Sequence, residues 1–103
     1  MKKNAITKFI KKTFREDLQA ILLSDKMRIN VVKYEITNDE QIKELLDTDK
    51  FVKINTNDEN YDVYIDARGL DFEKPLNLMA YSVLSRSFYG NVLLLKRNIK
   101  KER

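Results

Sequence analysis

The sequence predicts one α+β domain, in which an N-terminal amphipathic helix precedes elements in the order βαββαβ. Three segments repeat apolar residues at helical spacing, and four others alternate or are rich in β-branched and aromatic residues. A chain of 103 residues with 43% hydrophobic residues, 2 Gly and 1 Pro is typical of a single compact domain. We divide it into a basic amphipathic helix at 4–24, an α+β core at 27–97 and a basic tail at 98–103.

The first element is predicted as a helix because its apolar residues recur at steps of three and four. Asn4 is a plausible N-cap, and the pattern continues to about Ser24. Lysines and one arginine fall beside this apolar stripe. The stripe consists of Ile6, Ile10, Phe14, Leu18, Ile21 and Leu22.

The first half of the core predicts a strand, a helix and a second strand. "MRINVVKYEI" is rich in β-branched residues and indicates a strand. "TNDEQIKELL" begins with the capping residues Thr37 and Asn38 and carries acids in its first turn, which favours a helix. "KFVKINT" then indicates a strand, and "NDEN" a polar hairpin turn.

The second half predicts a strand, a helix and a final strand. Apolar and polar residues alternate from Tyr61 to Ala67, and Arg68-Gly69 offers a turn. Pro75 is expected in the first turn of the next helix. "FYGNVLLLKR" is apolar on both faces, so this strand is expected at the centre of the sheet. The order is compatible with a ferredoxin-like fold, a four-stranded, mainly antiparallel sheet with two helices on one face.

The charges are segregated along the chain, although the formal net charge is only +4. Residues 1–15 hold six basic residues and no acid, and the basic character returns after residue 74. Between Glu35 and Glu73, twelve acids face four basic residues. Such a distribution can attract a partner of either charge, so net basicity alone does not establish nucleic-acid binding.

The composition excludes several kinds of chemistry. The chain has no Cys and no His, which removes thiol nucleophiles, Ser-His-Asp triads and histidine-supported zinc sites. Asp62 and Asp66 share one side of a strand, but solvated acids explain them better than a metal site does. We therefore expect no enzymatic activity, no cofactor and no bound metal. No apolar run approaches a membrane span and no signal peptide is evident, so we expect a cytoplasmic protein.

The run "VYIDARGL", the following "PLN", Ala80 and "YGNVLLL" together resemble a small domain of unknown function that is widespread in phages and other mobile elements. The preceding "VVKYEI" and "FVKI" fit the layout of that family. The basic N-terminal helix is an addition to it, and Arg68 stands where such turns usually carry an acid. The resemblance implies an accessory protein, of which some inhibit bacterial defence, including anti-CRISPR proteins.

Two hypotheses for the function follow. In the first, the chain is a non-catalytic inhibitor that binds a host protein, such as a Cas nuclease or its RNA complex, and its acidic segment mimics nucleic acid in a basic groove. In the second, the basic helix binds nucleic-acid phosphates without reading sequence. The sequence does not indicate an oligomeric state. The acidic candidates are Asp58, Glu59, Asp62, Asp66 and Asp71, and the basic candidates are Lys8, Lys11, Lys12 and Arg15.

Overall fold

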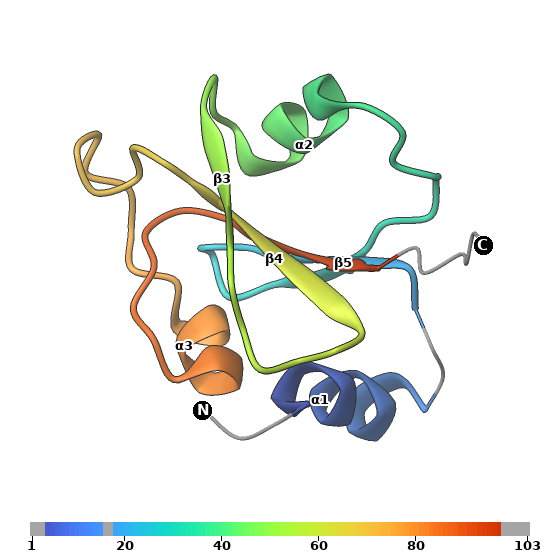
Figure 1. Cartoon of the computed structure of the whole chain (residues 1–103). Helices are drawn as coiled ribbons and strands as arrows, with labels where there is room; N and C mark the ends of the chain where they lie inside the picture. The colour runs from blue at the N-terminus through green and yellow to red at the C-terminus, as the bar shows by residue number, and fades with distance from the viewer. Residues whose placement is uncertain (1–3, 16–17, 98–103) are drawn as a thin grey trace.

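The computed structural model describes residues 4–15 and 18–97, so the predicted basic tail at 98–103 lies outside the described residues. Within these residues, three helices and five strands follow one another along the chain (Figure 1). In order, they are α1 (Ala5–Phe14), β1 (Ala20–Leu23), β2 (Ile29–Val31), α2 (Asp39–Leu46), β3 (Phe51–Ile54), β4 (Tyr61–Asp66), α3 (Leu78–Leu84) and β5 (Val92–Lys96).

The strands form one antiparallel sheet in the order β2-β1-β5-β4-β3. The predicted α+β class is confirmed. The prediction of four strands is wrong, and the strand order is not the ferredoxin-like one, because β1 lies between β2 and β5. The last strand is central, as its apolar faces predict: Leu94 pairs with Ile21 of β1 and with Val63 of β4.

The predicted helix at 4–24 is correct only in its first half. The helix α1 ends at Phe14, and Arg15 adopts a left-handed conformation with φ of 62°. Residues Ala20–Leu23 form a strand hydrogen-bonded on both sides, to β2 and to β5. A run of four apolar residues is ambiguous between helix and strand, and pairing with the neighbouring β2 and the distant β5 decides between them. Both edges of this strand are paired with a neighbouring strand, and three of its four side chains are buried.

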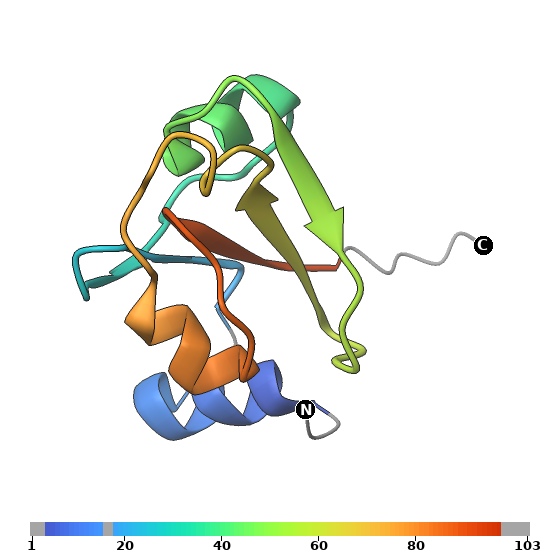
Figure 2. The ribbon, with the colours of Figure 1, turned by 90° about the vertical axis from the view of Figure 1, so that its left-hand side faces the viewer.

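The helices cover both faces of the sheet. The first and third helices, α1 and α3, lie together on one face and share a core of buried residues with the strands (Figure 2). On the other face, Ile42 and Leu46 of α2 pack with Leu93 of β5. The expected placement of the two core helices on one face is therefore wrong. The N-terminal helix instead joins α3, and the sheet is the middle of three layers.

The start of α2 is fixed by a capping box in which the predicted capping residue Asn38 pairs with Gln41. The Asn38 side chain accepts a hydrogen bond from the Gln41 backbone N–H at 3.0 Å, and the Gln41 side chain accepts one from Asn38 N–H at 3.3 Å. These contacts satisfy amide groups that have no partner within the helix. The helix is thereby held with one side on the sheet and its acidic side in solvent.

The start of α3 depends on Asn77, which is fully buried. Its side-chain oxygen accepts from the Ala80 N–H at 2.8 Å, and its amide donates to the carbonyls of Leu23 and Gly90, each at 2.8 Å. The helix therefore begins after Asn77, and Pro75 precedes it instead of lying in its first turn. One amide ties the end of β1, the loop before β5 and α3 together, which fixes the segment that precedes the helix.

Candidate functional site

The five predicted acidic residues do not form a common exposed face. Asp58 and Asp66 are buried, at 1% and 5% exposure. Asp62 is half-buried and its carboxylate contacts Arg97 Nε at 2.8 Å. Glu59 is exposed before the start of β4, and Asp71 is exposed beyond its end. Assigning Asp58 and Asp66 to a partner-binding surface is therefore a mistake, because neither carboxylate reaches the surface.

Asp58 instead organises the corner where α1 meets the β3–β4 turn. Its carboxylate accepts hydrogen bonds from Thr7 N–H at 2.7 Å and from the Thr7 hydroxyl at 2.9 Å. It also accepts from the N–H groups of Asn60 at 2.8 Å and Tyr61 at 3.2 Å. Because Thr7 lies in the first turn of α1, the negative charge also suits the positive end of the helix dipole. The role of Asp58 is structural.

Asp66 closes the opposite end of β4. One carboxylate oxygen accepts from the Thr48 hydroxyl and from Arg68 N–H, both at 2.8 Å, and the other contacts the Lys74 ammonium at 2.5 Å. Burial alone raises the pKa of Asp66, but the contacts with Lys74, Arg68 N–H and Thr48 outweigh it and hold the pKa below its ordinary value. Asp66 is therefore a charged structural anchor.

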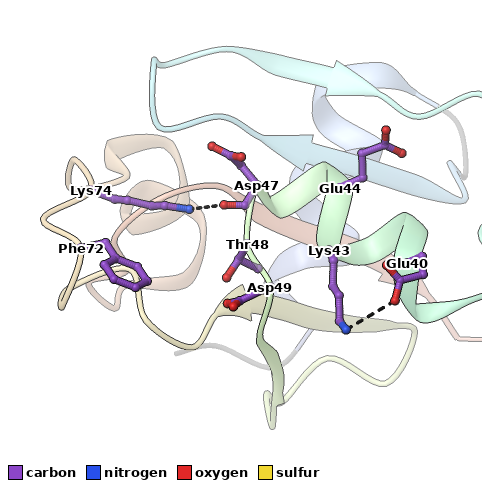
Figure 3. Close-up of a pocket in the computed structure, with 8 residues that line it drawn as sticks. All are labelled: Glu40, Lys43, Glu44, Asp47, Thr48, Asp49, Phe72 and Lys74. Carbon is purple, nitrogen blue, oxygen red and sulfur yellow. Dashed lines mark hydrogen bonds and ion pairs between the residues drawn. The ribbon is translucent and has the colours of Figure 1, made fainter.

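A groove of about 830 Å³ lies between α2 and the segment that follows β4 (Figure 3). Carboxylates from α2 and from the turn after it lie on one side, and Phe72 and Lys74 lie on the other (Figure 3). We call this feature the acidic groove. Its lining residues are Glu40, Lys43, Glu44, Asp47, Thr48, Asp49, Phe72 and Lys74.

The acidic groove is negative because its two lysines already have partners. Lys43 pairs with Glu40 at 3.5 Å, on the same helix. The Lys74 ammonium is shared between the Asp66 carboxylate and the Asp47 backbone carbonyl, each at 2.5 Å. Within the described residues, the carboxylates of Glu44, Asp47 and Asp49 make no hydrogen bond or ion pair, and all three residues are exposed. Negative charge in the groove is thus left uncompensated.

The spacing of acids along α2 indicates this groove, whereas the sequence prediction names only acids on and around β4. Glu40, Glu44 and Asp47 recur at steps of four and three, which places them on one face of α2. The buried residues of α2, Ile42 and Leu46, point to the sheet. The helical spacing alone therefore predicts that these three acids lie on the same side of the helix. The contributions of Phe72 and Lys74 come from a distant segment and are visible only in the fold.

Exposed apolar side chains are concentrated in the segment that contains Phe72. The described residues include eight exposed large apolar side chains, and five of them fall within residues 70–81. Phe72, one of the five, also lines the acidic groove. We call these five residues the apolar strip: Leu70, Phe72, Leu76, Leu78 and Tyr81.

The predicted basic residues do share one face. All four are exposed, and their spacing along α1 and its C-cap places them on one side of the helix. The buried Ile6 and Ile10 lie on the opposite side, against α3 and the sheet. The structure thus presents a continuous basic face in solvent. Its members are Lys8, Lys11, Lys12 and Arg15.

Comparisons with protein-family models, with curated proteins and with solved structures found no match to this chain. The resemblance to small phage-type domains therefore stays a prediction. Across residues 4–15 and 18–97, no group of three or more acidic side chains is placed to hold a metal ion. None of the described helices has both the length and the hydropathy needed to traverse a bilayer.

Proposed function

We propose that the protein is a small, non-catalytic accessory protein that binds and inhibits a host defence nuclease, such as a Cas effector. The observation that supports this most directly is the acidic groove, where Glu44, Asp47 and Asp49 are exposed and lack ion-pair partners among the described residues. The resemblance to phage-type accessory domains points to a defence protein as the partner.

Nucleases bind their substrates through basic surfaces, because nucleic-acid phosphates must be neutralised. Exposed carboxylates on a packed helix present negative charge to such a surface at little conformational cost. Complementary charge speeds association and disfavours acidic partners. The predicted role of the acidic segment thus narrows to α2 and the turn after it, which replace the buried residues of β4.

The test is an inhibition assay with purified, guide-loaded Cas nucleases and labelled target DNA. We expect the protein to slow cleavage by a susceptible nuclease in proportion to its concentration. Glu44→Lys and Asp49→Lys should each weaken inhibition at least tenfold, which corresponds to about 1.4 kcal/mol. Glu35→Lys is the matched control, because Glu35 is also exposed but does not line the groove.

An unchanged cleavage rate across a broad nuclease panel would reject inhibition of Cas effectors. Pull-down from bacterial lysate, with and without nuclease treatment, then shows whether any protein partner is retained. Equal loss of inhibition in Glu35→Lys and Glu44→Lys would show that overall charge acts, and not the groove.

Nucleic-acid binding by the basic face of α1 is a second candidate function, favoured by its exposure opposite the buried side of the helix. Replacing Lys8, Lys12 and Arg15 with Glu should abolish binding to labelled RNA or DNA, measured by fluorescence anisotropy at several salt concentrations. The same triple variant should retain inhibition if the acidic groove carries the function. Retained nucleic-acid binding would exclude the basic face as its site.

A further inference from the structure

The apolar strip is unusual because exposed apolar residues normally occur singly. Outside it, Met27, Tyr34 and Val52 are the exposed large apolar residues in the described part of the chain, and each comes from a different segment. Within the strip, Leu70 and Phe72 are 66% and 59% exposed. The strip follows one continuous stretch of chain, which runs from near α2 into α3 (Figure 2).

Hydrogen bonds hold the backbone of this stretch in place. Phe72 N–H donates to the Arg68 carbonyl at 3.0 Å, and Lys74 N–H donates to the Gly69 carbonyl at 2.9 Å. Gly69 packs so closely on the Tyr89 backbone that a side-chain carbon at this position would collide with the Tyr89 carbonyl. Gly90 N–H donates to the Pro75 carbonyl at 2.9 Å. The exposed apolar side chains therefore lie on a segment whose backbone is held in place by hydrogen bonds and close packing.

The far end of the strip lies on α3. Leu78 and Tyr81 are three residues apart, so they share one face of the helix, and both are at least half exposed. Ala80, Val83 and Leu84 occupy the opposite face and are buried. The inner face of α3 is thus packed in the core, and its outer face exposes two large apolar side chains.

The near end of the strip is negative. Phe72 faces α2 across the acidic groove, which is also lined by Glu44 and Asp49, whose carboxylates have no partner among the described residues (Figure 3). The Arg68 guanidinium lies over the Phe72 ring, 5.9 Å from its centroid, so one face of this ring already contacts a cation and the groove carboxylates are the remaining attraction for a basic partner. A complementary molecule therefore needs apolar side chains for the strip and basic side chains for the groove.

We propose that the apolar strip and the acidic groove form one docking surface for a basic, amphipathic segment of a protein partner. Apolar side chains of that segment cover Leu76, Leu78 and Tyr81, and its Arg or Lys side chains enter the groove beside Phe72. Recognition of this kind uses the apolar and charged sides of a helix together. The proposal rests on the proposed function in that the chain must bind a protein.

The probe is a synthetic amphipathic helical peptide with Leu on one side and Arg on the other. Two matched peptides replace all Arg by Glu or all Leu by Ser. We expect the Leu/Arg peptide to bind and both matched peptides to bind at least tenfold more weakly, measured by fluorescence anisotropy. Amide shifts in two-dimensional NMR spectra should change in residues 70–81 and along α2.

The variant Leu70→Ser/Phe72→Ser should weaken binding of the Leu/Arg peptide at least tenfold. Met27→Ser/Val52→Ser is the matched control, because it removes exposed apolar side chains outside the strip and should leave the affinity unchanged. Circular dichroism and urea unfolding check that both variants fold.

Absence of binding, equal binding of the Leu/Arg and Leu/Glu peptides, or NMR shifts confined to other surfaces would overturn the proposal. Sedimentation that shows a dimer, lost in Leu70→Ser/Phe72→Ser, would assign the strip to a second copy of the chain and would also overturn it. If Leu70→Ser/Phe72→Ser still inhibits a nuclease as strongly as the native chain does, the docking surface is rejected and the proposed function is not. If the chain binds the Leu/Arg peptide but inhibits no nuclease, the proposed function is rejected and the docking surface is not.

Discussion

Two groups of carboxylates in this chain have opposite environments. Asp58 and Asp66 are buried at the two ends of β4, and each accepts several short hydrogen bonds. Glu44 and Asp49, which line the acidic groove, are exposed and make no ion pair with the described residues. Burial therefore separates acids that hold the fold from acids that remain available to a partner. Substitutions in the two groups should affect different properties.

The physical basis is the cost of burial. A buried carboxylate is tolerated only when hydrogen bonds and opposite charges replace its water, and removing it leaves its donors without partners. An exposed carboxylate keeps its hydration, so its removal changes stability little. The comparison predicts large stability losses at β4 and small ones in the groove.

The largest effect is expected for Asp58→Ala. The substitution removes the acceptor for Thr7 and for the N–H groups of Asn60 and Tyr61, and these groups are partly or fully buried. We expect a loss of about 3 kcal/mol in the free energy of unfolding, measured by urea denaturation. Asp58→Asn keeps one acceptor oxygen and should lose less. A change below about 0.5 kcal/mol in Asp58→Ala would show that the corner tolerates its loss.

A smaller and pH-dependent effect is expected for Asp66→Asn. Lys74 loses its carboxylate partner but keeps the carbonyls of Asp47 and Leu46, so we expect a loss of about 2 kcal/mol at neutral pH. The pKa of Asp66 is lower in the folded than in the unfolded chain, so the ionised group stabilises the fold above pH of about 4. That stabilisation is lost as the pH falls through the lowered pKa.

Urea denaturation between pH 2 and 7 measures this difference. The free energies of unfolding of the native chain and of Asp66→Asn should converge at low pH and separate as the pH rises. A difference that stays constant with pH would show that the ion pair with Lys74 is not its source. Lys74→Met should change the same pH dependence, because the contact with Lys74 lowers the pKa of Asp66 together with the contacts of Arg68 N–H and Thr48.

The sequence predicts most elements whose signals are local. The helix at Asp39–Leu46 carries its own cap in Asn38 and Gln41, and the final strand is apolar on both faces. By contrast, residues 20–23 continue the helical spacing of α1, and the prediction overlooks the turn at residues 24–28 that pairs this strand with β2. Its pairing with β5, about seventy residues away, decides its conformation. Because the prediction lacks β1, it has four strands and not five, and it does not give the observed strand order.

The candidate site is less predictable than the fold, for a related reason. Alternation along β4 places Asp62 and Asp66 on one side of a strand, but it does not show which of them is covered. Asp66 is buried because Thr48 and Lys74 reach it from two other segments. The exposure of Leu70 and Phe72 likewise depends on how the stretch before α3 folds back on Tyr89 and Gly90. Partners from distant segments cannot be read from local spacing.

The smallest stability effect is expected for Glu44→Gln/Asp49→Asn, which removes two charges from the acidic groove while keeping the size of both side chains. Both carboxylates are solvated and unpaired among the described residues, so the free energy of unfolding should change by less than about 0.5 kcal/mol. Affinity for the Leu/Arg peptide should nevertheless fall several-fold, and its dependence on salt should weaken. A stability loss comparable to that of Asp66→Asn would place these acids among the structural carboxylates. An unchanged affinity would show that the groove does not contribute charge to binding. Measuring stability and affinity on the same variant therefore tests whether the groove acids serve binding and not folding.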